Sequence, residues 1–463
     1  MNETQRAIRA SGPTVGPVGG KAVAKNSAWA LGGRLTLMVG GLLLQILLAR
    51  SLDPTEFGDY YLVLSVAGLA AVVARLGSPE ALVRLLAERP ESSVPVIKQG
   101  FLLSLVGIVL TSAALLLGGA RLLLEGLFSV ERFPFIEVYI VVMMVLLAAQ
   151  IFISESFRGF NDIRWASVFN GASRSVMLVI ATGVAALLIE DLSLQFFLGI
   201  AITVGLITDL AGAWLLRRHV KTSPRSGPKL PVRELWSIAW PMMTNLLVLF
   251  ATVQAGLWVI GSKLSSPDVA RFGVAIQLVT LVTLPLVVVN AVAPPLIAGT
   301  YKERASHPQL QSTLRSMTTI AGIPSLILLI VFSLIGGPIL GLLFGDIYRD
   351  SGILLAILAL GQSANVWTGP CAAVLRMTGH QRALLTINLV YGVGGLLLSI
   401  ALIDDFGLVA VAAISSAALI GQNLTILAYS KSRTGLFTFI ELKPSQLRQH
   451  VEVVKSQISA RRG

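Results

Sequence analysis

Arg34 is the residue with the clearest chemical consequence in this sequence. It lies in an apolar stretch, residues 28–49, that is long enough to cross a bilayer. A guanidinium at that depth costs roughly 2.5–3.5 kcal/mol on insertion scales, so such residues usually face a bundle interior or a water-filled cavity. Met38, Gly41 and Gln45 follow at spacings that return to the same helix face. The stripe predicts a membrane cavity for an anionic, polar ligand; the alternative is a side chain that snorkels to the interface.

Neutral polar side chains supply the other candidates for this cavity. Asn245 and Thr252 share one helix face, and Gln362 and Asn365 share another. Amides both donate and accept hydrogen bonds, so they suit sugar hydroxyls. Their alternative role is hydrogen bonding between helices, often worth less than about 1 kcal/mol. The predicted substrate-binding residues are Arg34, Gln45, Asn245, Thr252, Gln277, Gln362, Asn365 and Asn388.

Acidic and metal-binding residues are scarce in the apolar segments. Asp209 and Glu155, near the ends of predicted spans, are the candidates for binding a coupling proton or cation; the alternative is a pair of solvated helix ends. The single cysteine, Cys371, excludes a disulfide framework and a cysteine-based metal site. The four histidines lack metal-ligand spacing. We therefore expect no catalytic residue, no metal and no cofactor.

The composition is that of a polytopic membrane protein. Of the 463 residues, 54% are hydrophobic and 13% are charged, and the mean hydropathy is +0.79, whereas a soluble domain is about 25% charged. The chain is polar up to residue 26, which is too long for a signal-peptide n-region, so we expect no signal peptide. Apolar runs of about 20 residues predict twelve spans, near 27–49, 57–75, 99–121, 135–155, 171–189, 194–216, 237–261, 272–297, 316–340, 352–372, 383–403 and 408–429.

The positive charge is concentrated on one side of the predicted membrane. Of the 36 Lys and Arg residues, 29 fall in the two tails and in alternate loops, six fall in the other loops, and Arg34 lies within a span. Cytosolic segments carry such an excess, so both tails are expected in the cytosol. The bias supports twelve spans in the cytoplasmic membrane. Because it explains the net charge of +12, we expect no nucleic-acid partner.

Two sequence patterns recur at similar offsets. Residues 158–164 (RGFNDIR) and 376–382 (RMTGHQR), 218 positions apart, each precede an apolar run that ends at an acidic pair. Residues 53–58 (DPTEFG) follow the first span, and residues 267–273 (PDVARFG) follow the seventh, about 215 positions later. A shift of six spans keeps the membrane orientation. The repeat therefore predicts two parallel lobes related by an axis along the membrane normal.

Three segments resemble motifs of the polysaccharide and lipid-linked oligosaccharide flippases. Residues 48–61 (LARSLDPTEFGDYY) resemble that family's AR-x-L-x-P-x-x-F/Y-G-x-Y stretch. Residues 76–84 (LGSPEALVR) resemble its loop after span 2, and residues 379–382 (GHQR) resemble its loop before span 11. The resemblance covers about residues 26–429 and places the chain near the multidrug/oligosaccharidyl-lipid/polysaccharide exporter superfamily.

The resemblance implies an all-α polytopic membrane protein with 12 transmembrane helices, in two six-helix lobes around a central cavity. It implies alternating access that moves an undecaprenyl-diphosphate-linked oligosaccharide from the inner to the outer leaflet, for cell-surface polysaccharide such as O-antigen. Family members carry cavity cations for the diphosphate, and Arg34 matches that pattern. The implied partners are the lipid-linked glycan, membrane lipids, and the glycosyltransferases and glycan polymerase of the pathway.

The expected organisation follows the apolar and basic segments. It comprises a cytosolic N-terminal tail (1–26), a first lobe (27–216), a basic cytosolic linker (217–236), a second lobe (237–430) and a basic tail (431–463). In the last tail, apolar residues recur at helical spacing with basic residues between them, namely Leu447, Val451, Val454 and Ile458. This spacing predicts a short amphipathic helix on the cytosolic leaflet. A solvated tail is the alternative.

Two other functions stay open at this stage. A multidrug or small-cation antiporter of the same superfamily would need a buried carboxylate at mid-membrane, and none is predicted there. An integral-membrane glycosyltransferase or glycan polymerase would need acidic catalytic residues in a sizeable external loop. The longest predicted external loop, near residues 122–134, has only about a dozen residues. We therefore expect a transporter rather than an enzyme.

Overall fold

The computed structural model describes residues 20–128, 130, 135–189, 191–221, 231–301 and 307–441, and these residues form helices and no strand. Three predicted features lie wholly or partly outside the described residues. They are the amphipathic tail helix, most of the basic linker, and Glu190 of the acidic pair at residues 190–191. The first lobe consists of α2 (Gly20–Ser51), α3 (Pro54–Ala74), α4 (Ser78–Glu88), α5 (Ser93–Ala114), α6 (Ile136–Gly159), α7 (Ile163–Ser167), α8 (Ser173–Leu188) and α9 (Leu194–Lys221), with a 3-10 turn at Pro90–Ser92 and π-helical turns at Leu115–Gly119, Leu122–Leu127 and Val168–Ala172. The second lobe consists of α10 (Val232–Lys263), α11 (Ser266–Val279), α12 (Leu284–Thr300), α13 (His307–Phe344), α14 (Gly352–Thr368), α15 (Cys371–Met377) and α16 (Gln381–Thr434), with 3-10 turns at Thr280–Thr283 and Asp346–Ser351.

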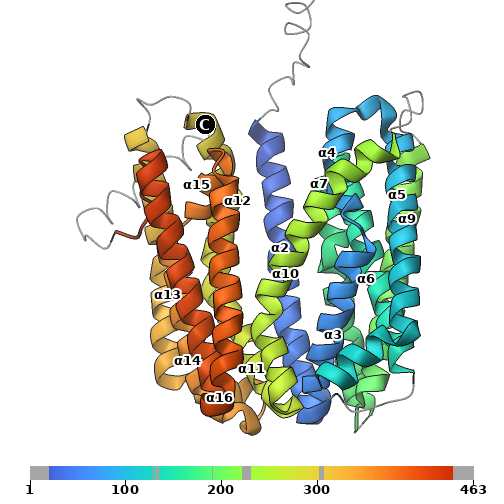
Figure 1. The fold of residues 1–463 in the computed structure, drawn as a ribbon, viewed down its shortest axis with the longest axis vertical. Coiled ribbons are helices and arrows are strands. Elements are labelled where there is room, and N and C mark those ends of the chain that lie inside the picture. The colour runs from blue at the N-terminus through green and yellow to red at the C-terminus, as the bar shows by residue number, and fades with distance from the viewer. Residues whose placement is uncertain are drawn as a thin grey trace, which may run out of the picture.

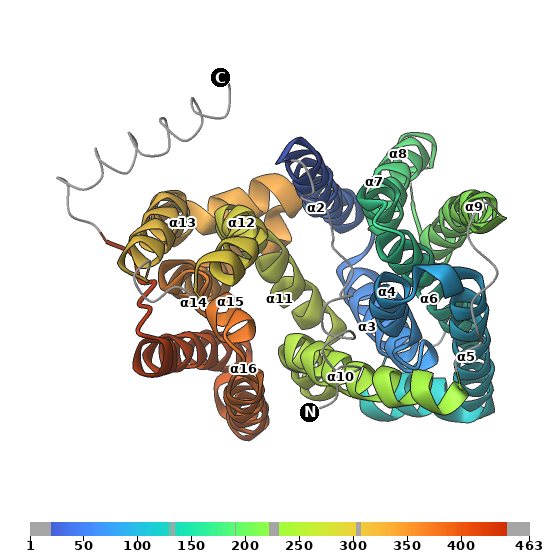
Figure 2. The ribbon, with the colours of Figure 1, turned by 90° about the horizontal axis from the view of Figure 1, so that it is seen from above.

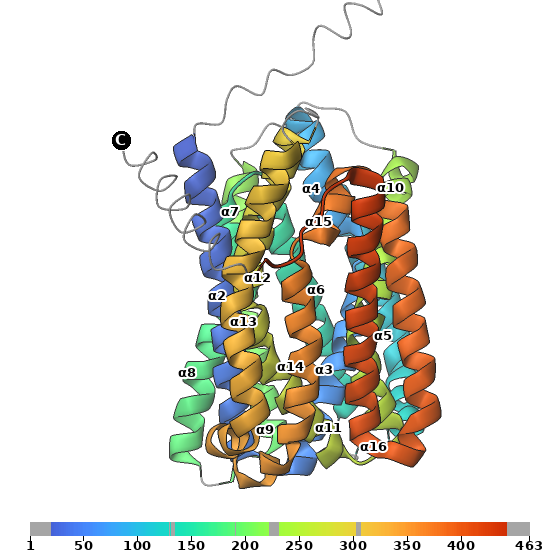
Figure 3. The same ribbon diagram turned by 90° about the vertical axis from the view of Figure 1, so that its left-hand side faces the viewer.

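The described chain crosses the membrane twelve times, as predicted. Eleven helical segments are long and apolar enough to cross, and the last of them, α16, contains two crossings. Its 54 residues would extend about 80 Å as one straight helix, whereas a bilayer core is about 30 Å thick. The helix reverses at Gly407, whose φ of 59° and ψ of −144° lie outside the helical region. Figure 3 shows the two halves of α16 as neighbouring rods.

Equivalent corners confirm the predicted internal repeat. Asn161, between α6 and α7, and Gly379, between α15 and α16, both have positive φ angles, of 60° and 85°, at positions that match the 218-residue offset of the sequence patterns. The starts of α3 and α11 also correspond. Asp53 caps α3 before a proline, and Ser265 begins a capping box before a proline in α11. The two lobes are therefore built from the same order of helices and turns.

The two lobes share a core at one end of the molecule and separate at the other. We call the end where α2 begins, at the top of Figure 1, the basic end, because most of the described Lys and Arg residues lie there; the other is the opposite end. At the opposite end one hydrophobic core contains Phe57 of α3 and Phe272 of α11. At the basic end the core around Phe157 belongs to the first lobe, and the core around Val374 belongs to the second. Figure 2, viewed from the basic end, shows α12, α13 and α15 on one side and α2, α4 and α7 on the other.

Helix α10 connects the lobes obliquely, as Figure 1 shows. Leu235 and Ala239, at its basic end, are buried in the core of the first lobe. Glu234 forms an ion pair of 2.5 Å with Arg89, which follows α4. Further along, Gly256 packs against Phe272 and Val411 of the second lobe. The first half of α10 therefore packs in the first lobe, whereas its second half contacts both lobes, since Trp258 also donates a 3.0 Å hydrogen bond to Ser65 of α3.

The repeated segments after spans 1 and 7 contact each other at the opposite end. Gly58 leaves no room for a Cβ atom against the Ser266 carbonyl, and the Ser266 hydroxyl donates a 2.5 Å hydrogen bond to Asp59. Arg50, at the end of α2, donates to the carbonyls of Leu342 and Leu343 (2.8 Å) in the last turn of α13. A cation at a helix C-terminus is stabilised by the helix dipole. The motif at residues 48–61 therefore holds the lobes together at this end.

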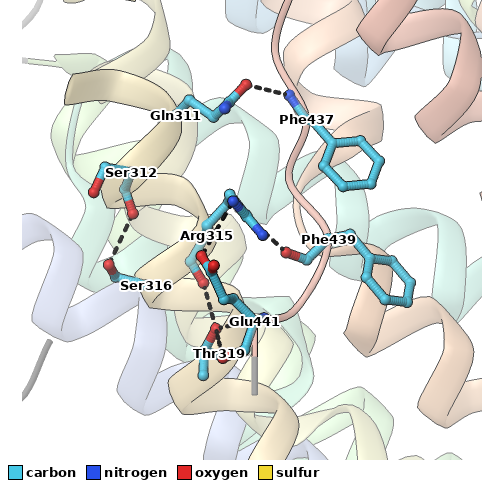
Figure 4. A network of polar contacts seen from close by, with 8 residues as sticks. All are labelled: Gln311, Ser312, Arg315, Ser316, Thr319, Phe437, Phe439 and Glu441. Atoms are coloured by element: carbon cyan, nitrogen blue, oxygen red, sulfur yellow. Dashed lines mark hydrogen bonds and ion pairs between the residues drawn. The ribbon is translucent and has the colours of Figure 1, made fainter. Parts of the chain in front are cut away.

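Residues 435–441 form an extended segment, which we call the strap, that packs into the second lobe after the last span. Figure 4 shows its contacts with α13. Glu441 forms an ion pair of 3.1 Å with Arg315, and the Phe437 amide donates to Gln311. The Ile440 amide donates to the Trp367 carbonyl of α14. The predicted basic tail, 431–463, includes this segment, and the structure adds that the segment packs against the second lobe, with Leu436 fully buried.

Candidate functional site

Arg34 lines a pocket of about 260 Å³ between the two lobes, nearer the basic end. Helix α2 contributes Ser27 and Arg34, the α6–α8 segment contributes Arg158 and Asn170, and α12 of the second lobe contributes Asn290. The Arg34 guanidinium is exposed and makes no hydrogen bond or ion pair with any residue that the structure describes. No carboxylate is among the residues that line the pocket. The pocket is therefore positively charged, with one guanidinium free for a ligand.

Arg158 is a second cation of this pocket. It lies in the last turn of α6, where the chain turns through Asn161, and forms an ion pair of 2.9 Å with Glu155 one turn earlier. This pairing orients Arg158 toward the pocket wall. Glu155 is a predicted candidate for binding a coupling proton or cation. In the structure its carboxylate is the ion-pair partner of a pocket arginine.

A break in the fifth span brings Asn170 to the pocket. The helix between α7 and α8 is interrupted at Asn170 and Gly171, and Gly171 has a φ of 98° that favours glycine. Three residues before Asn170, Ser167 packs against Gly33 of α2. The close contact sets the first and fifth spans side by side, so that Arg34 and Asn170 line one pocket.

The predicted stripe on α2 continues along the lobe interface. A Cβ atom on Gly41 would lie 3.6 Å from Nε2 of Gln277, which belongs to α11 of the second lobe. Gln45 is 8% exposed, and its side-chain oxygen accepts no hydrogen bond from the described residues. The face that carries Arg34 and Gly41 is therefore turned toward the other lobe, whereas Val39 and Leu43 lie on another face and are exposed.

The remaining predicted residues belong to a different pocket or to none. Thr252 and Gln362 line a second pocket of about 340 Å³ inside the second lobe. Asn388 accepts a 3.0 Å hydrogen bond from Gln422, which lines it, and Asn365 donates one of 3.3 Å to Gln362. Asn245 is exposed on α10 outside both lining sets. The structure therefore divides the predicted single cavity into a cationic pocket and a neutral one.

Asp209 is paired within the first lobe. Its carboxylate lies 2.8 Å from the guanidinium of Arg174, and both side chains are almost buried, at 11% and 12% exposure. The sequence interpretation counted Arg174 among the loop cations; this is wrong, because the residue lies in the first turn of α8, inside the fifth span. An arginine and an aspartate between two membrane helices neutralise each other, which reduces the cost of burying either.

Sequence reasoning missed Arg158, Asn170 and Asn290 as pocket residues. Arg158 was visible as one end of the repeated Arg-x5-Arg pattern, but its direction depends on the turn at Asn161. Asn170 faces the pocket because of a helix break that no periodicity indicates. Asn290 approaches Arg34 only through the packing of one lobe against the other.

Comparisons with known proteins agree with this architecture. Residues 23–301 match the model of the polysaccharide biosynthesis protein family. The fold is similar to that of a multidrug resistance MATE family transporter of the MOP superfamily in its inward-facing conformation, with a TM-score of 0.68, 15% identity and coverage of 88% of this chain and 98% of that one. The outward-facing conformation of such a MATE transporter gives a TM-score of 0.61, with 14% identity and coverage of 90% and 96%.

A similar fold is found in the lipid II flippase MurJ, in an inward closed conformation. The TM-score is 0.67, the identity is 12%, and the match covers 86% of each chain. No curated protein matches the sequence. With more than half of its length matched by the family model, the chain belongs to the polysaccharide biosynthesis protein family, and it has the two-lobed fold of the MOP superfamily of membrane transporters and flippases.

Proposed function

We propose that this protein flips an undecaprenyl-diphosphate-linked oligosaccharide from the cytosolic to the outer leaflet of the cytoplasmic membrane, for cell-surface polysaccharide such as O-antigen. The observation that carries the proposal is the unpaired Arg34 in a pocket between the lobes that Arg158 also lines. Planar guanidinium groups bind phosphate oxygens in a bidentate manner, and two of them suit a diphosphate better than a neutral or cationic solute. Family membership supports a polysaccharide pathway.

The proposed direction of transport follows from the charge distribution. The basic end is the cytosolic end in this scheme, since Lys and Arg accumulate on the cytosolic side. Labelling with an impermeant thiol reagent should then modify a cysteine at Ser193 in intact cells and spare one at Ser432. Both residues are exposed. Ser193 directly precedes span 6 at the opposite end, and Ser432 follows span 12 at the basic end. The reverse pattern would contradict the orientation.

Alternating access is the mechanism that the packing supports. The lobes share a core at the opposite end and have separate cores at the basic end, so we expect the Arg34 pocket to open toward the basic end. The lipid-linked glycan enters there from the inner leaflet, and rocking of the lobes then opens the opposite end. Arg34 and Arg158 accompany the diphosphate while its polyprenyl chain stays in the lipid.

Multidrug or cation antiport is less well supported, although MATE transporters share the fold. An antiporter for cationic drugs needs a carboxylate that is free to bind the cation, whereas Glu155 is paired with Arg158 and Asp209 with Arg174.

Reconstitution of the purified protein separates the two functions. Liposomes would carry fluorescent undecaprenyl-diphosphate-linked N-acetylglucosamine, and a membrane-impermeant quencher would report the labelled lipid in the outer leaflet. We expect protein-dependent movement of this lipid and no accumulation of ethidium in the same liposomes under a proton or sodium gradient. Ethidium accumulation without lipid movement would overturn the proposal in favour of the antiporter.

A further inference from the structure

The second-lobe pocket has a chemistry that the cationic pocket lacks. It lies between α10, α11, α14 and α16, and its polar lining consists of hydroxyl and amide groups, namely Thr252, Thr280, Gln362, Tyr391, Ser399, Ser415, Ser416 and Gln422. No charged side chain lines it. Its volume, about 340 Å³, is within the range of small-molecule sites.

Several of these groups have hydrogen-bonding capacity left over. Ser399 and Ser415 make no side-chain hydrogen bond with the residues that the structure describes, and Gln362 accepts one from Asn365 but donates none among them. Polar groups in a membrane-spanning bundle are costly without partners. The pocket thus offers free donors and acceptors together, which a hydroxyl-rich neutral molecule satisfies and a bare phosphate does not.

The pocket is also adjacent to the lobe interface. Gln277 of α11 faces Gly41 of α2 across that interface, and Thr280, one turn later, lines the pocket. On α10, Asn245 and Thr252 lie on one helix face, seven residues apart, so polar groups continue from the pocket toward the basic end. One ligand with an anionic and a neutral part could therefore use both pockets.

We infer that this neutral pocket is a sugar subsite, which binds the glycan of the lipid-linked substrate through its hydroxyl and acetamido groups while the arginine pocket binds the diphosphate. The inference rests on the proposed function. It assigns the two parts of the substrate to different places: the diphosphate binds between the lobes, and the sugar binds within the second lobe. Gly392 and Gly395 line the pocket beside Tyr391, and their lack of a side chain lets the first half of α16 pack closely against Thr252 of α10 and against Ala418, which brings the polar groups of the pocket together.

Two probes separate the two pockets. Equilibrium binding to the purified full-length protein would be measured with undecaprenyl diphosphate and with undecaprenyl-diphosphate-linked N-acetylglucosamine. We expect the sugar-bearing probe to bind about tenfold more tightly, as two or three net hydrogen bonds provide. The Gln362→Leu/Ser399→Ala variant should bind both probes within about twofold of each other, with its affinity for undecaprenyl diphosphate unchanged.

Matched variants make every outcome informative. Thr386→Val removes a hydroxyl from α16 outside the pocket and should keep the tenfold preference. Arg34→Ala should weaken the binding of both probes and keep the tenfold preference. An Arg34→Ala variant that binds both probes as tightly as the wild-type protein contradicts the diphosphate site, whereas the sugar subsite is tested by the preference alone. Equal affinity of the wild-type protein for both probes would overturn the sugar subsite, as would a preference that survives in the Gln362→Leu/Ser399→Ala variant.

Discussion

At the scale of single residues, the described membrane arginines differ in whether they have a protein partner. Arg174 is paired with Asp209 and Arg158 with Glu155, whereas Arg34 has no partner among the described residues. The sequence was sufficient to single out Arg34, because an arginine inside an apolar run is conspicuous. It was not sufficient to find the Arg174–Asp209 pair, because the two residues meet only when α8 packs on α9.

Removing the Arg34 guanidinium should abolish flipping without unfolding the protein. The residue is exposed and stabilises no other side chain, so Arg34→Ala should lower the initial flipping rate at least tenfold in the liposome assay, while the melting temperature in detergent stays within a few degrees. Arg34→Lys should retain part of the rate, since a point charge attracts phosphate without the bidentate geometry. A fully active Arg34→Ala variant would reduce Arg34 to an interfacial anchor.

Breaking the Arg174–Asp209 pair should destabilise the first lobe. Asp209→Ala leaves a buried guanidinium without its carboxylate, a change that typically costs about 3–5 kcal/mol. The double variant Arg174→Met/Asp209→Leu removes both charges and should recover most of the lost melting temperature. If Asp209 instead bound a coupling ion, Asp209→Ala would stop transport at unchanged stability, and thermal unfolding measured beside the flipping rate distinguishes these results.

At the scale of helices, the predicted spans agree with the structure because the length of an apolar run depends only on consecutive residues in the sequence. The interruptions are less predictable. The break at Asn170 and Gly171 coincides with an Asn-Gly dipeptide, which favours a turn, but at the edge of an apolar run this dipeptide indicates the end of a loop as readily as a break within a span. The strap is short, and its Phe437 and Phe439 are apolar without periodicity, so its burial depends on a groove formed by helices that are distant in sequence.

The strap should be required for the second lobe to be stable. A chain that ends after Thr434 lacks the Glu441 partner of Arg315 and the Ile440 amide that donates to Trp367, so its melting temperature should fall clearly below that of the full chain. A chain that ends after Leu442 keeps all the described strap contacts and is the matched control; it should melt like the full chain. Equal melting of both truncated chains would mean that the strap contributes nothing to stability.

At the scale of the whole molecule, the two lobes and their parallel relation were predictable, because the repeated patterns share an offset. The separation of the lobes at one end was not. It depends on the balance between one shared core and two separate ones, and on glycines that allow contact across the interface. Gly58 is one of these, since its lack of a side chain lets α3 approach the backbone at Ser266.

A disulfide across the opposite end should stop transport. Asp59 and Ser266 are in hydrogen-bond contact between the lobes, so the variant Asp59→Cys/Ser266→Cys, in a background with Cys371→Ala, should crosslink in this conformation. Oxidation should reduce flipping to background, and a reductant should restore it. Each single-cysteine variant controls for loss of the native side chain. A crosslinked protein that still flipped lipid would indicate a fixed groove along which lipid headgroups slide.

The strap also has a consequence for how the protein is made. It follows the last span in the chain, so all twelve spans leave the ribosome and enter the membrane before residues 435–441 are available. Until then, Arg315 in α13 lacks Glu441, and the Trp367 carbonyl at the end of α14 lacks its amide donor. The first lobe has no such dependence and can assemble during synthesis. Completion of the second lobe therefore waits for residues that follow the last span, and a nascent chain that is cut short before residue 435 enters the membrane with an unfinished second lobe.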